Sequence, residues 1–191
     1  MIKLCFIDTE TTGLDPKKNG ILEIGCIIEI GDFIDEFVIE CSPFEKDEIN
    51  DKALEVNRIS KDGLFKRTPP KTAYHQFIET LSQHVDRYNR HDKFFFLAYN
   101  APFDNNFLRE FFLKNDDSYF GSYFFYPPID VAVLAAMYLR DNRSRMFNFK
   151  LTTVAPVMGI DIDTAKAHSA LYDTQIMRAV YYKVMNDGIQ S

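Results

Sequence analysis

Two carboxylates near the start of the chain, Asp8 and Glu10, lie two residues apart at the end of a short apolar run, 4–7. If this run is a strand, both side chains point to one face, at a sheet edge where open α/β folds bind ligands. Carboxylates held this close repel each other, and Mg²⁺ or Mn²⁺ would offset the repulsion because these cations prefer oxygen ligands. The alternative is a strand end followed by a capped polar turn, and the pair alone leaves both interpretations open.

Three more acids and one histidine lie where they could join this pair. Asp104 comes at the start of an expected helix, Asp173 lies in the first turn of the last expected helix, and His168 comes five residues before it. Each has an ordinary alternative: acids favour the positive end of a helix dipole, Asp130 caps a helix, and His168 is a solvated loop residue. Together with the first pair, Asp104 and Asp173 would place four acids at one sheet edge, which is costly unless cations bind.

The elements that position these residues follow from hydrophobic periodicity and turn signals. Strands are expected over 2–8, 21–30, 33–41 and 94–99 and within 123–130. Helices are expected from Asn100 onward and over 51–59, 72–90, 131–138, 151–158 and 169–185. The 94–99 strand lacks polar alternation, as a strand buried on both faces does. The order of elements predicts one α/β domain, 1–191, with a five-stranded mixed sheet (an antiparallel meander plus two parallel strands) flanked by helices.

Composition bounds the class of protein. With 191 residues, 46% of them hydrophobic and 15% aromatic, the chain can bury a sizeable core. Its net charge of -6 argues against tight non-specific binding of long nucleic acid, although bound cations can reverse the sign at a small site. The loop 140–150 carries Arg140, Arg143, Arg145 and Lys150, which would either steer a phosphate backbone or form a solvated loop.

The cysteines and the termini predict a compartment. Cys5, Cys26 and Cys41 lie in separate apolar runs, which indicates buried, reduced thiols. Seven residues precede Asp8, too few for a signal peptide, and no apolar run approaches the ~20 residues that span a bilayer. We therefore expect a cytoplasmic protein with no membrane partner.

Three motifs make the chain similar to a known family. They are residues 6–13 (FIDTETTG), 100–108 (NAPFDNNFL) and 168–173 (HSALYD). In order and separation they resemble the DnaQ-like 3′–5′ exonucleases of the ribonuclease H-like superfamily, in the subgroup with a catalytic histidine. The resemblance covers almost the whole chain and implies the ribonuclease H-like fold. Residues 167–174 and the 53–59 helix are particularly similar to the bacterial ribonuclease T branch.

This resemblance implies a catalytic centre. Two divalent cations, Mg²⁺ or Mn²⁺, would be held by Asp8, Glu10, Asp104 and Asp173, with His168 as the general base. Two metals ~3.5–4 Å apart stabilise the attacking and leaving oxygens of an in-line displacement, and a neutral imidazole can take a proton from water. The expected products are nucleoside 5′-monophosphates, released from the 3′ end of single-stranded or short DNA or RNA.

The resemblance also assigns contacts with the terminal bases, to Thr11, Leu14, Val56, Asn100, Phe103 and Tyr126. Apolar and aromatic side chains hold bases without reading their sequence, and stacking on an aromatic ring contributes ~1–3 kcal/mol per base. The alternative places Leu14, Val56 and Phe103 in the core. The ribonuclease T branch has phenylalanine at several of these positions, whereas this chain has Leu14, Val56 and Tyr126 at three of them, so the specificity of that branch is not carried over. Tyr99 stands where many relatives have histidine.

Two other functions would use the same fold: a catalytically silent nucleic-acid-binding domain, or a proofreading domain that works beside a polymerase. A silent domain would be expected to lack one of the four acids or the histidine, and all five are present. The short segment after the last expected helix argues mildly against a tethered polymerase subunit. Some relatives are homodimers, and here Phe111, Phe112, Phe124 and Phe125 would form either such an interface or part of the core.

Overall fold

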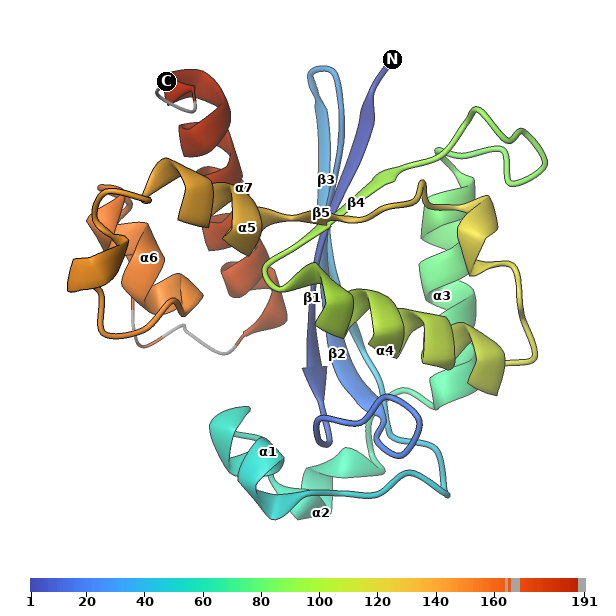
Figure 1. Cartoon of the computed structure of the whole chain (residues 1–191). Helices are drawn as coiled ribbons and strands as arrows, with labels where there is room; N and C mark the ends of the chain where they lie inside the picture. Colours follow the sequence, from blue (N-terminus) through green and yellow to red (C-terminus); the bar gives the residue numbers. More distant parts are fainter. Residues whose placement is uncertain (164, 166–168, 189–191) are drawn as a thin grey trace.

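A central sheet with helices on both sides organises the protein (Figure 1). The computed structural model describes residues 1–163, 165 and 169–188. The strands are β1 (Lys3–Thr11), β2 (Ile21–Ile30), β3 (Phe33–Glu40), β4 (Phe95–Ala98) and β5 (Ile129–Asp130), in the order β3-β2-β1-β4-β5. The first three pair antiparallel, and β4 runs parallel to both β1 and β5. The predicted mixed sheet, a meander plus two parallel strands, is confirmed.

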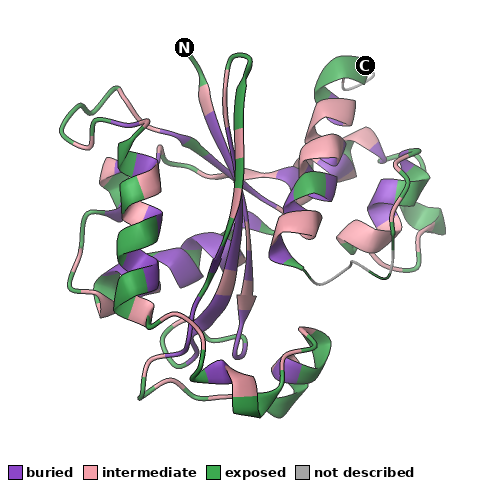
Figure 2. Cartoon of the chain, turned by 180° about the vertical axis from the view of Figure 1, so that it is seen from behind, coloured by how far each residue is buried: buried purple, intermediate pink, exposed green. Residues whose placement is uncertain are grey.

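Helices cover the sheet and leave its buried side chains in the middle. The helices α3 (Pro70–Ser82) and α4 (Ala101–Lys114) lie on one side (Figure 1). On the other side lie α5 (Val131–Tyr138) and α7 (Ala170–Asp187), with α6 (Leu151–Val157) packed against α7. The short α1 (Asp51–Val56) and α2 (Lys61–Leu64) lie beyond the end of β1. Figure 2 shows the buried residues along the strands and on the sheet-facing sides of the helices.

The phenylalanine-rich face belongs to the core. Phe111, Phe112 and Phe124 are buried and Phe125 is half-buried. The Phe112 ring packs edge-on against Phe120, in the short 3₁₀ turn Phe120–Ser122, with ring centroids 5.2 Å apart. The prediction that these phenylalanines belong to the core is therefore confirmed, and the alternative prediction that they form an exposed dimer interface is wrong.

Two helices end earlier than predicted, and local contacts explain both ends. The helix expected over 72–90 stops at Ser82, because Asp86 accepts a hydrogen bond from the Tyr88 amide (3.0 Å) and so stabilises a turn instead. The helix expected over 51–59 stops at Val56, and Arg58 has a φ of 55°, a left-handed conformation that cannot continue it.

The last two strands are also shorter or more exposed than predicted. The strand expected within 123–130 is limited to Ile129–Asp130, because Pro127 and Pro128 have no amide hydrogen to pair. Burial of the 94–99 strand on both faces is wrong at Phe95, whose residue is 36% exposed and whose ring packs on Phe125 at 5.1 Å.

The cysteines are buried free thiols, as predicted. The sulfur atoms of Cys5 and Cys26 lie 3.4 Å apart on neighbouring strands, farther than the ~2.05 Å of a disulfide. Burial raises the pKa of Cys41 to about 12. Within the described residues, no helix combines the length and the apolar character needed to cross a membrane.

Candidate active site

The second half of β1 presents Asp8 and Glu10 on one face of the sheet. Both side chains are half-buried, while the intervening Thr9 is buried. In the antiparallel pairing with β2, Asp8 lies opposite Gly25 and Glu10 lies opposite Glu23. The strand therefore positions its two acids as the sequence predicted, and it adds a third acid from the neighbouring strand.

Asp104 reaches the same strand from the first turn of α4. Its residue is 3% exposed, and its Oδ1 accepts hydrogen bonds from the backbone N–H of Thr9 (2.9 Å) and from Thr9 Oγ1 (2.8 Å). The parallel strand β4 ends at Ala98, so Asp104 binds the β1 backbone beyond the point where β4 stops. These two bonds fix the Asp104 carboxylate beside Asp8.

Asp173 comes from the first turn of α7, and residues of β2 hold the start of this helix in place. Glu23 Oε1 accepts a hydrogen bond from the Ala170 amide at the start of α7 (3.0 Å). Thr174 Oγ1 donates to the carbonyl oxygen of Gly25 (3.2 Å), and a Cβ on Gly25 would lie 2.2 Å from the carbonyl carbon of Ala170. Only glycine allows this approach, so Gly25 and Glu23 determine where Asp173 lies.

The sequence prediction missed Glu23 and Gly25 as positioning residues. The available signals were an acid that interrupts an apolar strand and a glycine inside that strand, which often marks close approach of another backbone. Neither signal identifies α7 as the partner, because the contact joins segments about 150 residues apart.

Three carboxylates converge closely enough to share a cation. One oxygen from each of Asp8, Glu10 and Asp173 lies within 4.8 Å of the others. One ion that binds oxygen at the Ca²⁺ distance of 2.3–2.6 Å can contact oxygens up to about 5.2 Å apart, and so can reach all three. Mg²⁺, which binds at 2.0–2.1 Å, needs the oxygens within about 4.2 Å of one another. Asp104 lies outside this group of three. The donor set fits a hard divalent ion, which the sequence predicted for this edge of the sheet.

Burial raises the pKa values of three acids in the cluster, and the neighbouring negative charges add to this effect. Burial, followed by Asp104, Glu10 and Asp173, holds the pKa of Asp8 well above its usual range. Burial, followed by Asp173 and Glu23, raises the pKa of Glu10 to about 7. Burial also raises the pKa of Asp104 to about 7, although its bonds with Thr9 act in the opposite direction. A bound cation would reverse this balance by favouring the ionised carboxylates.

The remaining catalytic prediction, His168, lies outside the described residues. Ser169, which follows it, is the N-cap residue of α7. Asp130 is the helix cap that its alternative interpretation expected, because its Oδ1 accepts from the Ala132 amide (2.9 Å).

A groove of about 360 Å³ lies next to Glu10. Of the six residues expected to contact bases, four line it: Thr11, Leu14, Val56 and Phe103. The Leu14 residue is 83% exposed and the Val56 residue 54% exposed, so the core alternative is wrong for both. Phe103 is half-buried and packs on Phe107, with ring centroids 4.8 Å apart.

The other two expected contacts lie outside this groove. Asn100 is exposed at the N-cap of α4, where it has a left-handed φ of 69° and its amide donates to Asp130 Oδ1 (3.1 Å). Tyr126 is 85% exposed. Tyr99 is half-buried and its hydroxyl donates to the carbonyl oxygen of Phe149 (2.9 Å).

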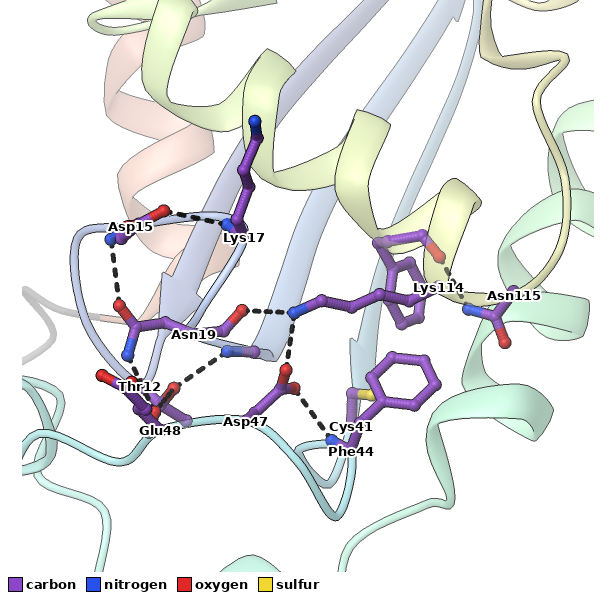
Figure 3. Close-up of polar contacts among 12 residues, drawn as sticks. Thr12, Asp15, Lys17, Asn19, Cys41, Phe44, Asp47, Glu48, Lys114 and Asn115 are labelled. Atoms are coloured by element: carbon purple, nitrogen blue, oxygen red, sulfur yellow. Dashed lines mark hydrogen bonds and ion pairs between the residues drawn. The ribbon is translucent and has the colours of Figure 1, made fainter.

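A polar network at the far end of α4 holds the groove wall. Lys114 Nζ donates to the carbonyl oxygen of Asn19 (2.8 Å) and lies 2.5 Å from Asp47 Oδ1 (Figure 3). The other Asp47 oxygen accepts from the Phe44 amide (2.9 Å), and Asn19 Nδ2 donates to the Glu48 carbonyl oxygen (2.8 Å). This network joins α4 to the two segments, 12–20 and 43–50, that carry the groove residues Leu14 and Asn50. The sequence prediction missed it, because its members are ordinary loop residues.

Known proteins match nearly the whole chain. The sequence model of a family described as exonuclease matches residues 5–181. Ribonuclease T of Buchnera aphidicola subsp. Baizongia pistaciae is 29% identical over 190 residues, which cover 94% of this chain and 82% of that protein. A PolC-type DNA polymerase III of Thermotoga petrophila is 28% identical over 178 residues, which cover 93% of this chain but 11% of the polymerase.

Solved structures agree with this match at the level of the fold. Escherichia coli exonuclease I in complex with a dT13 oligonucleotide superposes with a TM-score of 0.75 at 19% identity, over 96% of this chain and 41% of that one. The zinc-bound exonuclease I complex with single-stranded DNA gives a TM-score of 0.78 over 98% of this chain. The chain spans about two fifths of exonuclease I, and the likeness confirms the ribonuclease H-like fold expected from the motifs.

Proposed function

Because the chain belongs to the DnaQ-like exonuclease family, we propose that it is a metal-dependent 3′–5′ exonuclease acting on single-stranded or short DNA or RNA. The observation that carries the proposal is the convergence of the Asp8, Glu10 and Asp173 oxygens beside an open groove. The single-stranded oligonucleotide bound to the related exonuclease I supports the choice of substrate.

In the proposed mechanism, Asp8, Glu10, Asp104 and Asp173 would hold two Mg²⁺ or Mn²⁺ ions. These ions would neutralise charge on the phosphodiester and make bound water more acidic. Thr9 keeps the Asp104 carboxylate oriented through two hydrogen bonds, and Glu23 keeps Asp173 in place through the start of α7. His168, assigned by its motif, would take the proton of the attacking water, and the product is a nucleoside 5′-monophosphate.

The groove would hold the 3′-terminal nucleotides. Leu14 and Val56 expose apolar surface there, and Thr11 and Phe103 also line the groove. Such side chains contact bases without reading sequence, which favours activity on many sequences. Asn100 and Tyr126 lie outside the groove, and their contact with the terminal bases stays a prediction.

The proposal is tested by incubating 5′-labelled single-stranded DNA and RNA oligonucleotides with Mg²⁺, Mn²⁺ or EDTA. We expect a ladder that shortens from the 3′ end, disappears in EDTA and is reduced ~10²- to 10⁴-fold in His168→Ala, the range for loss of a general base. Asp32→Asn, at an exposed hairpin position, is the matched control and should leave the ladder unchanged. Absence of cleavage of both polymers with either metal would overturn the assignment.

The similarity to one segment of a PolC-type polymerase favours proofreading beside a polymerase as the second candidate. It predicts weak cleavage by the isolated chain and stimulation by a polymerase.

We further propose that residues 1–191 act as one domain, which the continuous core from Leu4 to Val184 supports. We also propose that the chain is cytoplasmic, which its buried free thiols support. A homodimer stays a prediction, to be checked by light scattering.

A further inference from the structure

We propose that the loop 140–150, named here the basic loop, binds the backbone and a base of a single-stranded nucleic acid several nucleotides from its 3′ end. This inference rests on the proposed exonuclease function, because it describes where the rest of that substrate would lie. Nothing in the acidic cluster or the groove requires this loop, so its features need a separate explanation.

The loop presents one aromatic ring to solvent from an anchored backbone. Phe147 is 98% exposed, whereas Met146 and Phe149 on either side pack against the core. The Phe149 carbonyl oxygen accepts a hydrogen bond from the Tyr99 hydroxyl (2.9 Å), and Asn148 Oδ1 accepts from Thr153 Oγ1 (2.7 Å). The ring is thus held outward by its packed neighbours, which is the geometry of a platform on which a base can stack.

The charge around this ring is opposite to that of the whole protein. Four exposed basic residues and one acid lie within 140–150, in a chain whose net charge is -6. The Arg143 guanidinium lies 4.9 Å from the centre of the Phe149 ring, a contact within the loop that holds this positive charge close to the loop backbone. No ion pair between described residues involves Arg145 or Lys150. Basic side chains beside an exposed aromatic ring match the phosphate and base of a single strand, as in grooves that bind such strands without sequence preference.

The anchor also connects the loop to the candidate active site. Tyr99, which holds Phe149, directly precedes Asn100 at the N-cap of α4, and the first turn of α4 contains Asp104. Figure 1 shows the basic loop (orange) beside α5 and α6, on the α7 side of the sheet, and α1 beyond the end of β1. A nucleic-acid strand whose 3′ end lies in the groove next to Glu10 would therefore pass the acidic cluster of β1 and α7 before it reaches the basic loop.

The test compares a triple variant of the loop, R143S/R145S/F147S, with a matched triple variant elsewhere, F65S/K66S/K71S. The control also removes two exposed positive charges and one exposed phenylalanine, since Phe65 is 67% exposed. For a long oligo-dT substrate we expect the loop variant to raise KM about tenfold or more, while kcat and cleavage of a dinucleotide stay unchanged. The dependence of log KM on log salt should fall by about 0.7 for each phosphate that the variant no longer neutralises.

Binding separates failure of this inference from failure of the proposed function. In an Asp8→Asn background, fluorescence anisotropy of labelled oligo-dT reports affinity without cleavage, so it applies even if the wild-type protein is inactive. We expect the loop variant to weaken binding about tenfold and the control variant to leave it unchanged. Equal effects of the two triple variants, or an equal loss for dinucleotide and long substrates, would overturn the role of the basic loop while leaving the exonuclease assignment intact.

Discussion

The two ends of α4 each bring a charged side chain against other charged groups, and they do so in opposite ways. At its start, Asp104 joins a cluster in which Asp8, Glu10 and Asp173 supply only negative charge. At its end, Lys114 meets Asp47, whose side chain is 3% exposed and whose oxygens are matched by Lys114 and by the Phe44 amide. One end therefore concentrates charge of one sign, and the other neutralises it.

This difference is the one expected between a site that binds a ligand, at the Asp104 end, and an ion pair that stabilises the fold, at the Lys114 end. A buried charge with a matched partner and satisfied hydrogen bonds can fix the position of loops, here the wall of the groove. Buried charges of one sign oppose folding unless a ligand compensates them, and this is the expected state of a metal site without its ion. The comparison predicts that substitutions at the two ends will change different properties of the protein.

The largest effect is expected from Asp8→Asn in the acidic cluster. Loss of one charged ligand should reduce cleavage about 1,000-fold, because metal-assisted charge stabilisation contributes several kcal/mol and each 1.36 kcal/mol is tenfold in rate. The same change should raise the melting temperature of the metal-free protein, because it removes repulsion with Asp104, Glu10 and Asp173. Activity assays and thermal denaturation in EDTA check both parts, and a fall in melting temperature would contradict this view of the cluster.

At the other end, Lys114→Met should mainly lower stability. It leaves Asp47 buried without its cation, which costs about 3 kcal/mol of the unfolding free energy, the lower limit for a broken buried pair, because the Lys114 side chain is 21% exposed. The groove wall should also shift, so KM for oligonucleotides rises while kcat holds. Urea denaturation and steady-state kinetics measure the two effects.

Two further variants isolate the role of the Lys114–Asp47 ion pair. Lys183→Met removes an exposed ion pair with Asp187 and should leave both measurements close to those of the wild type. The double variant D47N/K114M should recover part of the stability that Lys114→Met removes. If the double variant were as unstable as the single one, the unpaired charge of Asp47 would not be the cause.

The two ends also differ in how far the sequence predicted them. Asp8, Glu10, Asp104 and Asp173 were found because carboxylates follow strand ends or begin helices within motifs that resemble a family. The structure brings three of them within 4.8 Å of one another. Lys114, Asp47 and Asn19 were missed, because their contacts join loops distant in the chain and no periodicity marks them. Most strands and helices followed from periodicity alone.

The errors in the predicted fold arose where local contacts or residue types opposed the expected helix or strand. Asp86 bonds its own turn, so α3 ends eight residues before the expected end at Arg90. Prolines 127 and 128 cannot pair, so β5 is limited to its last two residues. Gly25 was visible in the sequence, but its meaning depended on where α7 packs. Such contacts are properties of the tertiary structure, and a single sequence does not contain them in readable form.

Gly25→Ala tests whether the backbone contact with α7 maintains the acidic cluster. Its Cβ would lie 2.2 Å from the Ala170 carbonyl carbon, so α7 must move and carry Asp173 with it. We expect a fall in kcat of at least tenfold and a loss of about 1–3 kcal/mol in the unfolding free energy. Gly121→Ala is the matched control, because among the described residues its added Cβ would have no heavy atom within 4 Å apart from those of Gly121 and its two chain neighbours. Equal kcat values for the two variants would contradict the positioning role.

The last prediction is a pH dependence of stability that arises at the acidic end of α4 and not at the Lys114 end. Burial raises the pKa values of Glu10 and Asp104 to about 7 each in the folded, metal-free protein. In the unfolded chain, both carboxyl groups have their ordinary pKa values and lose their protons at lower pH. Between these two pH values the folded protein therefore binds more protons than the unfolded chain. The unfolding free energy should therefore be highest near pH 4–5 and decrease as the pH rises toward about 7.

Saturating Mg²⁺ or Mn²⁺ should oppose this decrease, because metal binding requires ionised carboxylates and strengthens over the same pH range. Melting temperatures measured in EDTA and in metal should thus diverge as the pH rises. Lys114→Met should keep this divergence, since its pair lies outside the cluster, whereas Asp8→Asn should reduce it. A divergence that survived Asp8→Asn unchanged would place the metal elsewhere and remove the distinction between the two ends of α4.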